Sequence, residues 1–262
     1  MPVCELNEPF ASLWRNKEPF AAVAALQGEE FRKVKNRRTF RVEINSQGFF
    51  VKYHSGTSLR EIIKNLLQFK LPVTGADVEV KALEKLRALR IPTMQTAAYG
   101  WRNNNPLRRE SFIITPEITD ALSLEDMVEK GFPPALRREI IRQLAAMMKT
   151  MHGSGMNHRD CYLCHFLWQE KTQTLFVIDL HRAQIRKKVP RHYLVKDIAG
   201  LLFSALDMPL RRRDVWYFIR IYTGKKLHDE LTVNGKFWDS VLRTALKLYR
   251  KEFGKEPENF PF

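Results

Sequence analysis

Short apolar runs separated by polar turns dominate the first third of the chain. Residues 31–34, 39–44 and 49–53 are rich in β-branched and aromatic side chains, and such runs predict strands. A basic segment, 35–38, separates the first two runs, and the polar segment 45–48 separates the last two. Connections this short join neighbouring antiparallel strands, so we expect a meander.

Helical periodicity follows the meander. In residues 58–69 the apolar positions recur every three or four residues, and a second helix is predicted over 76–89, before Pro92. Two further strands are expected at 94–99 and 111–114. Together with the meander, these strands predict a five-stranded antiparallel sheet accompanied by helix.

After residue 115 the pattern becomes mainly helical. Residues 123–130 predict a short helix, and 134–151 predict a long one with a single apolar face. A loop that contains His158 then leads into an apolar strand over 174–179, and most of the chain beyond that strand has helical spacing.

This order of elements predicts an α+β protein with two lobes. We expect an N-lobe over 1–115, built on the antiparallel sheet, and a mainly helical C-lobe over 116–262. A five-stranded sheet with an inserted helix, followed by a helical half, is the plan of the bilobal protein-kinase-like fold.

The tripeptide His158-Arg159-Asp160 follows the long predicted helix and a glycine-containing turn, where a kinase carries its catalytic loop. Asp179 ends the next apolar strand. Phosphoryl transfer needs one carboxylate that orients the attacking hydroxyl and accepts its proton, and a second that holds Mg²⁺ against the nucleotide phosphates. The sequence therefore offers two aspartates for two different tasks.

Lys52 lies inside the apolar strand 49–53, where an ammonium group without a partner is costly to bury. A nucleotide phosphate and a carboxylate on a helix would remove that cost. Glu79 is our choice for the carboxylate, and Asp77 and Glu84 are its rivals. The order of strand lysine, helix glutamate, His-Arg-Asp and strand-end aspartate indicates a kinase that uses ATP and Mg²⁺.

Composition narrows the class of protein further. Of the 262 residues 44% are hydrophobic, enough for a sizeable core, and the net charge of +15 attracts anions such as nucleotide phosphates, acidic proteins or anionic lipids. No nucleic-acid recognition motif accompanies that charge. The start of the chain does not resemble a signal peptide, no apolar run is long enough to span a bilayer, and three cysteines are too few for a disulfide scaffold. We therefore expect a cytoplasmic protein.

Long and unusual motifs carry a resemblance to a known family. The segment His-Arg-Asp-Cys-Tyr-Leu-Cys-His-Phe-Leu at 158–167 and the segment Val-Ile-Asp-Leu-His-Arg-Ala-Gln at 177–184 resemble the lipopolysaccharide core heptose(I) kinase family. The match extends from about Glu8 to about Tyr222. Further similar segments are 59–67, 71–77, 111–115 and 195–201.

The resemblance implies transfer of the γ-phosphate of ATP to the 4-hydroxyl of the first heptose in the inner core of a lipid A-linked polysaccharide. It implies that Asp160 is the catalytic base, that Asp179 binds Mg²⁺, and that Lys52, held by Glu79, binds the α- and β-phosphates. Asp197 matches the buried aspartate that supports the catalytic loop. The family's acceptor is anchored in the inner membrane, so peripheral contact with its cytoplasmic face is expected. Acyl carrier protein, which is acidic and associated with this family, is a further expected partner.

The nucleotide-binding region departs from the general kinase pattern. The first hairpin turn carries Arg37 and Arg38 in place of glycines, so we expect arginine side chains to contact the phosphates there. Thr115 and Glu117, at the connector between the lobes, are further candidates for nucleotide binding.

The catalytic loop departs from the pattern as well. His165 stands where kinases place a metal-binding asparagine, and because Mg²⁺ prefers oxygen ligands, a second metal site at His165 stays open. Tyr162 stands where protein kinases have a lysine that steadies the γ-phosphate, so we expect a nearby arginine, not identified from the sequence, to take that role. His158 is expected to pack and hydrogen-bond beneath the loop.

Alternative functions share these features. The segment between Asp179 and Asp197 is too short for the peptide platform of protein kinases, which favours a small or branched acceptor such as a sugar. A protein kinase or a small-molecule kinase with the same site is one alternative. A basic scaffold that binds an acidic partner without catalysis is the other.

Two further features have a structural and a functional interpretation. Cys161 and Cys164 are spaced as in zinc sites, but the sequence has no second ligand pair, so packing thiols are favoured. The apolar stripe of the predicted helix 58–69 favours a core over a membrane surface.

Overall fold

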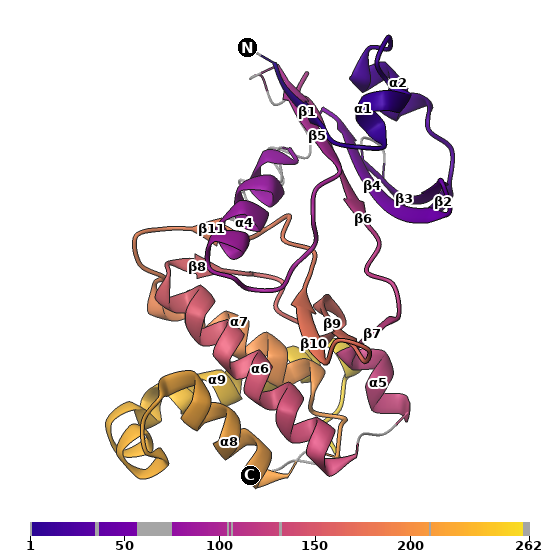
Figure 1. Cartoon of the computed structure of the whole chain (residues 1–262). Helices are drawn as coiled ribbons and strands as arrows, with labels where there is room; N and C mark the ends of the chain where they lie inside the picture. The colour runs from indigo at the N-terminus through magenta and orange to yellow at the C-terminus, as the bar shows by residue number, and fades with distance from the viewer. Residues whose placement is uncertain are drawn as a thin grey trace. The chain divides into compact units, whose positions relative to one another are not determined.

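A computed structural model gives the fold, and the chain divides into two compact units (Figure 1). The first comprises Met1–Lys85 and Met94–Thr119, and the second comprises Leu86–Thr93 and Asp120–Phe262. The division predicted at residue 115 thus falls near the one at Thr119. The predicted helix over 58–69 lies outside the described residues. These residues are 2–34, 37–56, 75–103, 105, 107–130, 133–209 and 211–258, without the side chains of 32–34 and 128–130.

A six-stranded antiparallel sheet forms the centre of the first unit. Its strand order is β1-β5-β6-β4-β3-β2, with an additional edge strand, β1. Four of the predicted strands are present near their predicted positions, whereas the strand predicted at 94–99 is displaced to Ala98–Arg102. The sequence analysis missed β1 because three of its four residues are exposed, so it has no apolar pattern. The strands are β1 (Val3–Leu6), β2 (Glu29–Val34), β3 (Arg37–Ile44), β4 (Gln47–Ser55), β5 (Ala98–Arg102) and β6 (Glu110–Pro116).

Two short helices, α1 (Phe10–Leu13) and α2 (Pro19–Ala25), place Phe10, Phe20 and Val23 in one core with the sheet. The ring of Phe10 meets Phe49 of β4 edge-on at 5.1 Å, and Phe20 meets Phe112 of β6 at 5.3 Å. All four rings are at most 4% exposed. Burial of each such side chain contributes about 1.5 to 3 kcal/mol, so these contacts fix β4 and β6 in place.

Helix α4 (Asp77–Ala88) begins next to β6. The backbone N–H of Ala76 donates to Ser111 Oγ at 3.0 Å, and Arg109 forms an ion pair with Asp77 at 3.0 Å. This pairing attaches the start of the helix to the sheet, and it gives Asp77 a partner other than Lys52. The predicted range for this helix, 76–89, is confirmed to within a residue at each end.

The second unit is mainly helical, as predicted (Figure 1). Two small antiparallel sheets accompany the helices, one with the order β10-β9-β7 and the other formed by β11 and β8. The elements are β7 (Ala121–Ser123), α5 (Leu124–Lys130), α6 (Pro134–Gly153), β8 (Met156–Asn157), η1 (Leu163–His165), β9 (Phe166–Gln169), β10 (Thr174–Val177), β11 (Gln184–Ile185), α7 (Arg191–Ser204), α8 (Arg212–Thr223) and α9 (Leu227–Phe253).

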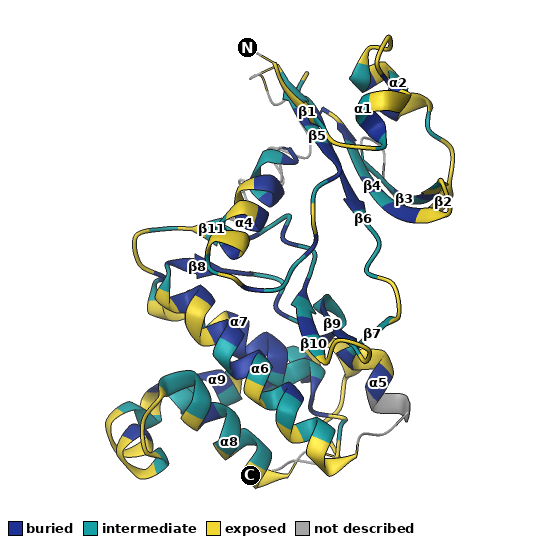
Figure 2. Cartoon of the chain, viewed as in Figure 1, coloured by how far each residue is buried: buried dark blue, intermediate teal, exposed yellow. Residues whose placement is uncertain are grey.

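Helices α7 and α9 enclose a hydrophobic cluster of the second unit, which includes Ile198 and Ala199 and so positions the middle of α7, where Asp197 lies. Buried and exposed positions alternate along α6 and α9, as expected for amphipathic helices (Figure 2). Among the described residues, no helix is both long and apolar enough to cross a bilayer. The buried residues of the cluster are Ile198, Ala199, Leu206, Phe237, Val241, Ala245 and Tyr249.

Candidate active site

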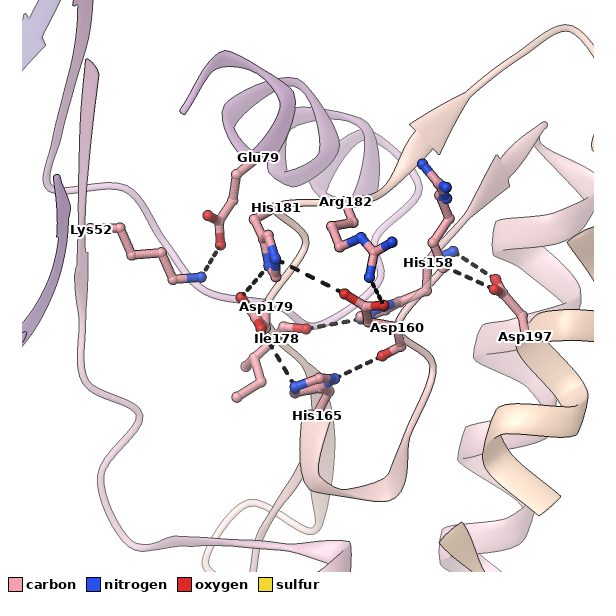
Figure 3. A network of polar contacts seen from close by, with 11 residues as sticks. Lys52, Glu79, His158, Asp160, His165, Ile178, Asp179, His181, Arg182 and Asp197 are labelled. Atoms are coloured by element: carbon pink, nitrogen blue, oxygen red, sulfur yellow. Dashed lines mark hydrogen bonds and ion pairs between the residues drawn. The ribbon is translucent and has the colours of Figure 1, made fainter. Parts of the chain in front are cut away.

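Strand alternation places Lys52 away from the aromatic core of the first unit. Phe49 and Val51 of β4 are buried in that core, so Lys52 projects from the opposite face of the sheet. Its Nζ lies 2.8 Å from Glu79 Oε1, and Glu79, on α4, is only 2% exposed (Figure 3). A carboxylate this deeply buried requires such a partner. The predicted pairing of Lys52 with Glu79 is therefore present.

The other predicted nucleotide ligands have protein partners within the first unit. Arg38 donates to the carbonyl oxygens of Ala24 and Leu26, both at 3.4 Å, and lies 3.3 Å from a carboxylate oxygen of Glu30. Arg37 is the first residue of β3 and lies opposite His54 in the register of β3 and β4. Contact of either arginine with phosphates stays a prediction.

The connector residues show a similar arrangement. Thr115 is 5% exposed in β6, and the carboxylate of Glu117 accepts two hydrogen bonds from Arg41, at 2.9 and 2.7 Å. Since Gly48 accepts from the backbone N–H of Glu117, the connector is attached to the β3–β4 hairpin. Nucleotide binding by Thr115 and Glu117 stays a prediction too.

In the second unit Asp197 holds the loop that contains Asp160. Asp197 is 1% exposed on α7, and its two carboxylate oxygens accept from the backbone N–H groups of His158, at 2.6 Å, and of Arg159, at 2.9 Å (Figure 3). His152 adds a third contact at 3.3 Å. Arg159 has a left-handed backbone with φ of 73°, a strained conformation for a residue with a side chain, and the two bonds fix it. The supporting role predicted for Asp197 matches these contacts.

His158 is fully buried and belongs to the same support. Its Nε2 lies 3.0 Å from the carbonyl oxygen of Ile178, to which it donates, and its ring stacks on His165. Burial lowers the pKa of His158, because the charged imidazolium loses its hydration, so the ring is neutral. The predicted packing role agrees with this geometry.

The carboxylate of Asp160 meets two residues that follow Asp179. Arg182 donates to Asp160 Oδ1 at 2.7 Å, and His181 Nε2 lies 4.0 Å from Asp160 Oδ2 (Figure 3). Arg182 is the one arginine whose side chain contacts Asp160 among the described residues. It is therefore the candidate for the arginine that the presence of Tyr162 led us to expect.

Asp179 lies two residues beyond the end of β10, in a turn where its own φ is 57°. His181 Nδ1 lies 2.8 Å from its Oδ1, and His165 Nε2 lies 3.5 Å from its Oδ2 (Figure 3). His165 Nδ1 lies 2.7 Å from the carbonyl oxygen of Asp160 and must donate to it. The predicted strand 174–179 is thus two residues too long, and the sequence analysis missed His181, although it lies only two residues after Asp179.

The donor set around Asp179 fits a magnesium ion bound together with a nucleotide. No group of three or more histidine, cysteine, aspartate or glutamate side chains in the described parts of the chain is arranged to hold a metal alone. Mg²⁺ in kinases takes one or two carboxylates, and phosphate oxygens and water supply its remaining ligands. Asp179 fits the first requirement, whereas the nitrogen of His165 is a poor ligand for this ion.

Of the two cysteines of the loop, Cys161 is buried and Cys164 is half-buried. Cys161 is 2% exposed, with its Sγ 3.8 Å from Met148 Sδ, and burial raises the pKa of both Cys161 and Cys164, the latter to about 11. Thiols in this state are protonated and poor metal ligands. The interpretation as packing residues is therefore favoured over a zinc site.

Away from Asp160, the second unit has a basic groove of about 700 Å³ next to an apolar cavity of about 320 Å³. The cavity lies among α6, α7, α8 and α9, and both features include Arg137, Asp214 and Trp216. We call the first feature the basic groove. Its charged lining consists of Arg137, Arg138, Arg211, Arg213, Arg220, Lys226 and Asp214.

The sequence matches a known family over most of its length. A family model described as "Lipopolysaccharide kinase (Kdo/WaaP) family" covers residues 21–222. A protein named lipopolysaccharide core heptose(I) kinase WaaP from Escherichia coli is 47% identical over 237 residues, which is 87% of this chain and 89% of the relative. Its namesake from Pseudomonas aeruginosa is 43% identical over 257 residues, or 94% of this chain and 96% of the relative.

A solved structure supports the same conclusion. The structure titled "WaaP in complex with acyl carrier protein" superposes with a TM-score of 0.80 at 38% identity and covers 94% of this chain and 99% of that one. The predicted fold class and the resemblance found in the sequence are thereby confirmed. The chain belongs to the lipopolysaccharide kinase (Kdo/WaaP) family.

Proposed function

We propose that this chain transfers the γ-phosphoryl group of ATP to the 4-hydroxyl of the first heptose in the inner core of a lipid A-linked polysaccharide. The names of the relatives support this acceptor. The observation that carries the proposal is the loop of Asp160, which Asp197 holds through two backbone N–H groups. An acceptor anchored in a membrane and a donor found in the cytoplasm place the reaction at the cytoplasmic face of the inner membrane.

Asp160 acts in this proposal as the residue that orients the sugar hydroxyl and accepts its proton. Arg182 fixes one oxygen of the carboxylate at 2.7 Å and leaves the other for the hydroxyl. The same guanidinium supplies positive charge for the equatorial oxygens of the transferred phosphoryl group, so it takes the role of the lysine whose position Tyr162 occupies. A carboxylate held in one orientation needs little rearrangement during the reaction.

The remaining residues bind the nucleotide. Lys52 contacts the α- and β-phosphates, and Glu79 orients the ammonium. Asp179 holds Mg²⁺, which neutralises phosphate charge when it is bound, and His181 orients the carboxylate from Oδ1. Further predicted contacts to the nucleotide come from Arg37, Arg38, Thr115 and Glu117. His165 stays a candidate ligand of a second metal ion.

The test is Asp160→Asn with labelled ATP and heptose-terminated core lipopolysaccharide. We expect kcat to fall at least about a hundredfold, because a positioned acid–base group is removed. Binding of ATP should be retained, and linkage analysis of the wild-type product should find phosphate on the heptose 4-hydroxyl. Labelling of an added peptide but not of heptose, or full activity of Asp160→Asn, would overturn the proposal. Glu252→Gln, an exposed substitution on α9 that lines neither the basic groove nor the apolar cavity, is the control.

An acidic protein partner is proposed as well. The structural relative is described in complex with acyl carrier protein. The basic groove offers six cations against one carboxylate, a surface complementary to an acidic protein, and the adjoining cavity is apolar, as an acyl chain requires. We therefore assign acyl carrier protein to this face of the second unit.

Titration of this chain with acylated acyl carrier protein tests the partner. The double variant Arg138→Glu/Arg213→Glu reverses two exposed charges of the groove and should weaken binding more than tenfold at low salt. Arg243→Glu, an exposed charge reversal on α9, should change binding little. Equal losses for the double variant and this control would refute the assignment.

A further inference from the structure

Three cations of the second unit gather around one aromatic ring, that of Tyr193 on α7. The guanidinium carbon of Arg186 lies 4.6 Å from the ring centroid, the ammonium of Lys196 lies 5.7 Å from it, and the guanidinium carbon of Arg159 lies 6.0 Å from it. Each distance is within the range of a cation–π contact. One ring therefore holds three positive side chains close together, beside the loop that contains Asp160.

These cations lack an acidic partner in the part of the chain that the structure describes. Arg186 donates to the neutral side chains of Asn157, at 2.7 Å, and of Gln184. Arg159 and Lys196 have no side-chain hydrogen bond or ion pair with any described residue. The neighbouring carboxylates are already engaged, since Asp160 pairs with Arg182 and Asp197 accepts from the backbone.

Arg159 is the most constrained of the three. It is half-buried, its backbone is held in the left-handed region with φ of 73°, and Asp197 fixes its N–H at 2.9 Å. Burial lowers the pKa of Arg159, and the nearby charge of Arg182 lowers it further. A guanidinium kept among like charges and partly out of water is stabilised when an anion binds.

We propose that Arg159, Arg186 and Lys196 bind a carboxylate of an acidic sugar that neighbours the phosphorylated heptose. Arg159 directly precedes Asp160, the residue proposed to orient the acceptor hydroxyl, so the acceptor is the molecule that we infer brings the anion to these cations. A planar guanidinium matches a carboxylate through two parallel hydrogen bonds, and Lys196 adds a mobile charge at the exposed side. This inference rests on the proposed function, because it names what the same site recognises in its acceptor.

The experiment compares wild type and variants of Arg159 on two forms of the acceptor, with and without its carboxylates. Wild type, Arg159→Gln and Arg159→Lys are assayed with intact core lipopolysaccharide and with the same acceptor after chemical reduction of its carboxyl groups to alcohols. With the intact acceptor, Arg159→Gln should lower kcat/KM for the acceptor about 10- to 100-fold, as expected for loss of a hydrogen bond to a charged group. With the reduced acceptor, wild type and Arg159→Gln should be equal to within about threefold, and the KM for ATP should be unchanged throughout.

Controls separate this role from a structural one and from other anions. Arg159→Lys should recover part of the loss with the intact acceptor, and the salt dependence of kcat/KM should be weaker for Arg159→Gln than for wild type. Arg243→Gln should behave as wild type. A dephosphorylated acceptor with its carboxylates intact should keep the full effect of Arg159→Gln.

The outcomes are distinguishable. If wild type does not phosphorylate the intact acceptor, the proposed function fails. If wild type does so but Arg159→Gln is equally impaired on the intact and reduced acceptors, the carboxylate site is wrong. If the effect of the substitution disappears on the dephosphorylated acceptor, the ligand is a phosphate, and the assignment to a carboxylate is overturned.

Discussion

Replacing Asp197 by asparagine tests how the catalytic loop is held. The carboxylate accepts from two backbone N–H groups, of His158 at 2.6 Å and of Arg159 at 2.9 Å, and it is 1% exposed. An asparagine has a single acceptor oxygen, so its NH₂ group would face one of these donors. The substitution thus removes one charge-assisted hydrogen bond and leaves one buried N–H without an acceptor.

The magnitude follows from these two losses. A hydrogen bond to a charged group contributes about 1.5 to 3 kcal/mol, and an unsatisfied buried donor costs about 1 to 3 kcal/mol, so together about 2.5 to 6 kcal/mol is lost. Domains of this size have about 5 to 15 kcal/mol of stability. At about 2 to 4 °C for each kcal/mol, the melting temperature of Asp197→Asn should fall by roughly 5 to 25 °C. Differential scanning calorimetry measures this directly.

Activity provides the second half of this test. Well below the new melting temperature, Asp197→Asn should keep its KM for ATP and lose kcat about tenfold or more, because the loop no longer fixes Asp160. Tyr222→Phe is the graded control: it removes the hydroxyl that contacts His152 at 2.8 Å but leaves both backbone bonds of Asp197. It should cost only about 0.5 to 1.5 kcal/mol. A melting temperature of Asp197→Asn equal to that of wild type would refute the reasoning.

Two further predictions concern the buried ion pair and the thiols. Glu79→Gln should weaken ATP binding and lower the melting temperature, because it removes the carboxylate that pairs with the ammonium of Lys52. The double variant Lys52→Met/Glu79→Leu should regain stability but not ATP binding. Thermal unfolding measures the stability of each variant and nucleotide titration its affinity for ATP, and a Glu79→Gln variant as stable as wild type would contradict this prediction. With a thiol reagent at pH 8, exposed Cys4 should react first, while Cys161 and Cys164, whose pKa values burial raises, should react only after unfolding; three fast thiols in the native protein would disprove this.

Residues whose role follows from chain order could be predicted from the sequence. The pattern of apolar positions placed Lys52 in a strand and Glu79 on a helix. The choice of Glu79 over Asp77 and Glu84 was a hypothesis, and the role of Asp197 came only from the family resemblance. Their contacts in the structure match the predictions because β4, α4 and α7 are regular elements, in which spacing alone sets the direction of each side chain.

Residues in the turn after β10 could not be predicted in the same way. Asp179 has φ of 57°, and a left-handed residue redirects the chain that follows it, so no periodicity describes where His181 and Arg182 point. The sequence predicted that some arginine replaces the lysine whose position Tyr162 occupies, but it did not identify Arg182 as that arginine. The contact of Arg182 with Asp160 in the structure makes it the candidate for that function.

Strand β1 and helices α1 and α2 could not be predicted from the sequence for a different reason. Strand β1 is largely exposed and pairs only with β5, so its position depends on a partner almost a hundred residues away in the chain, not on its own pattern. Helices α1 and α2 are short, and each places few apolar residues into the core. Elements of this kind are stabilised by tertiary packing, to which local propensity contributes little.

The second unit shows why its loop needs so many fixed contacts. Asp160 and Asp179 carry like charges, and His165 touches both residues, through the carbonyl oxygen of Asp160 and a carboxylate oxygen of Asp179. Arg182 supplies the opposing charge to Asp160. Because each carboxylate already has a donor on at least one oxygen, neither has to reorganise before a phosphoryl group arrives, and dipoles fixed in advance stabilise a transition state more than mobile ones do. Loosening the support at Asp197 should therefore reduce turnover more than it reduces the binding of substrates.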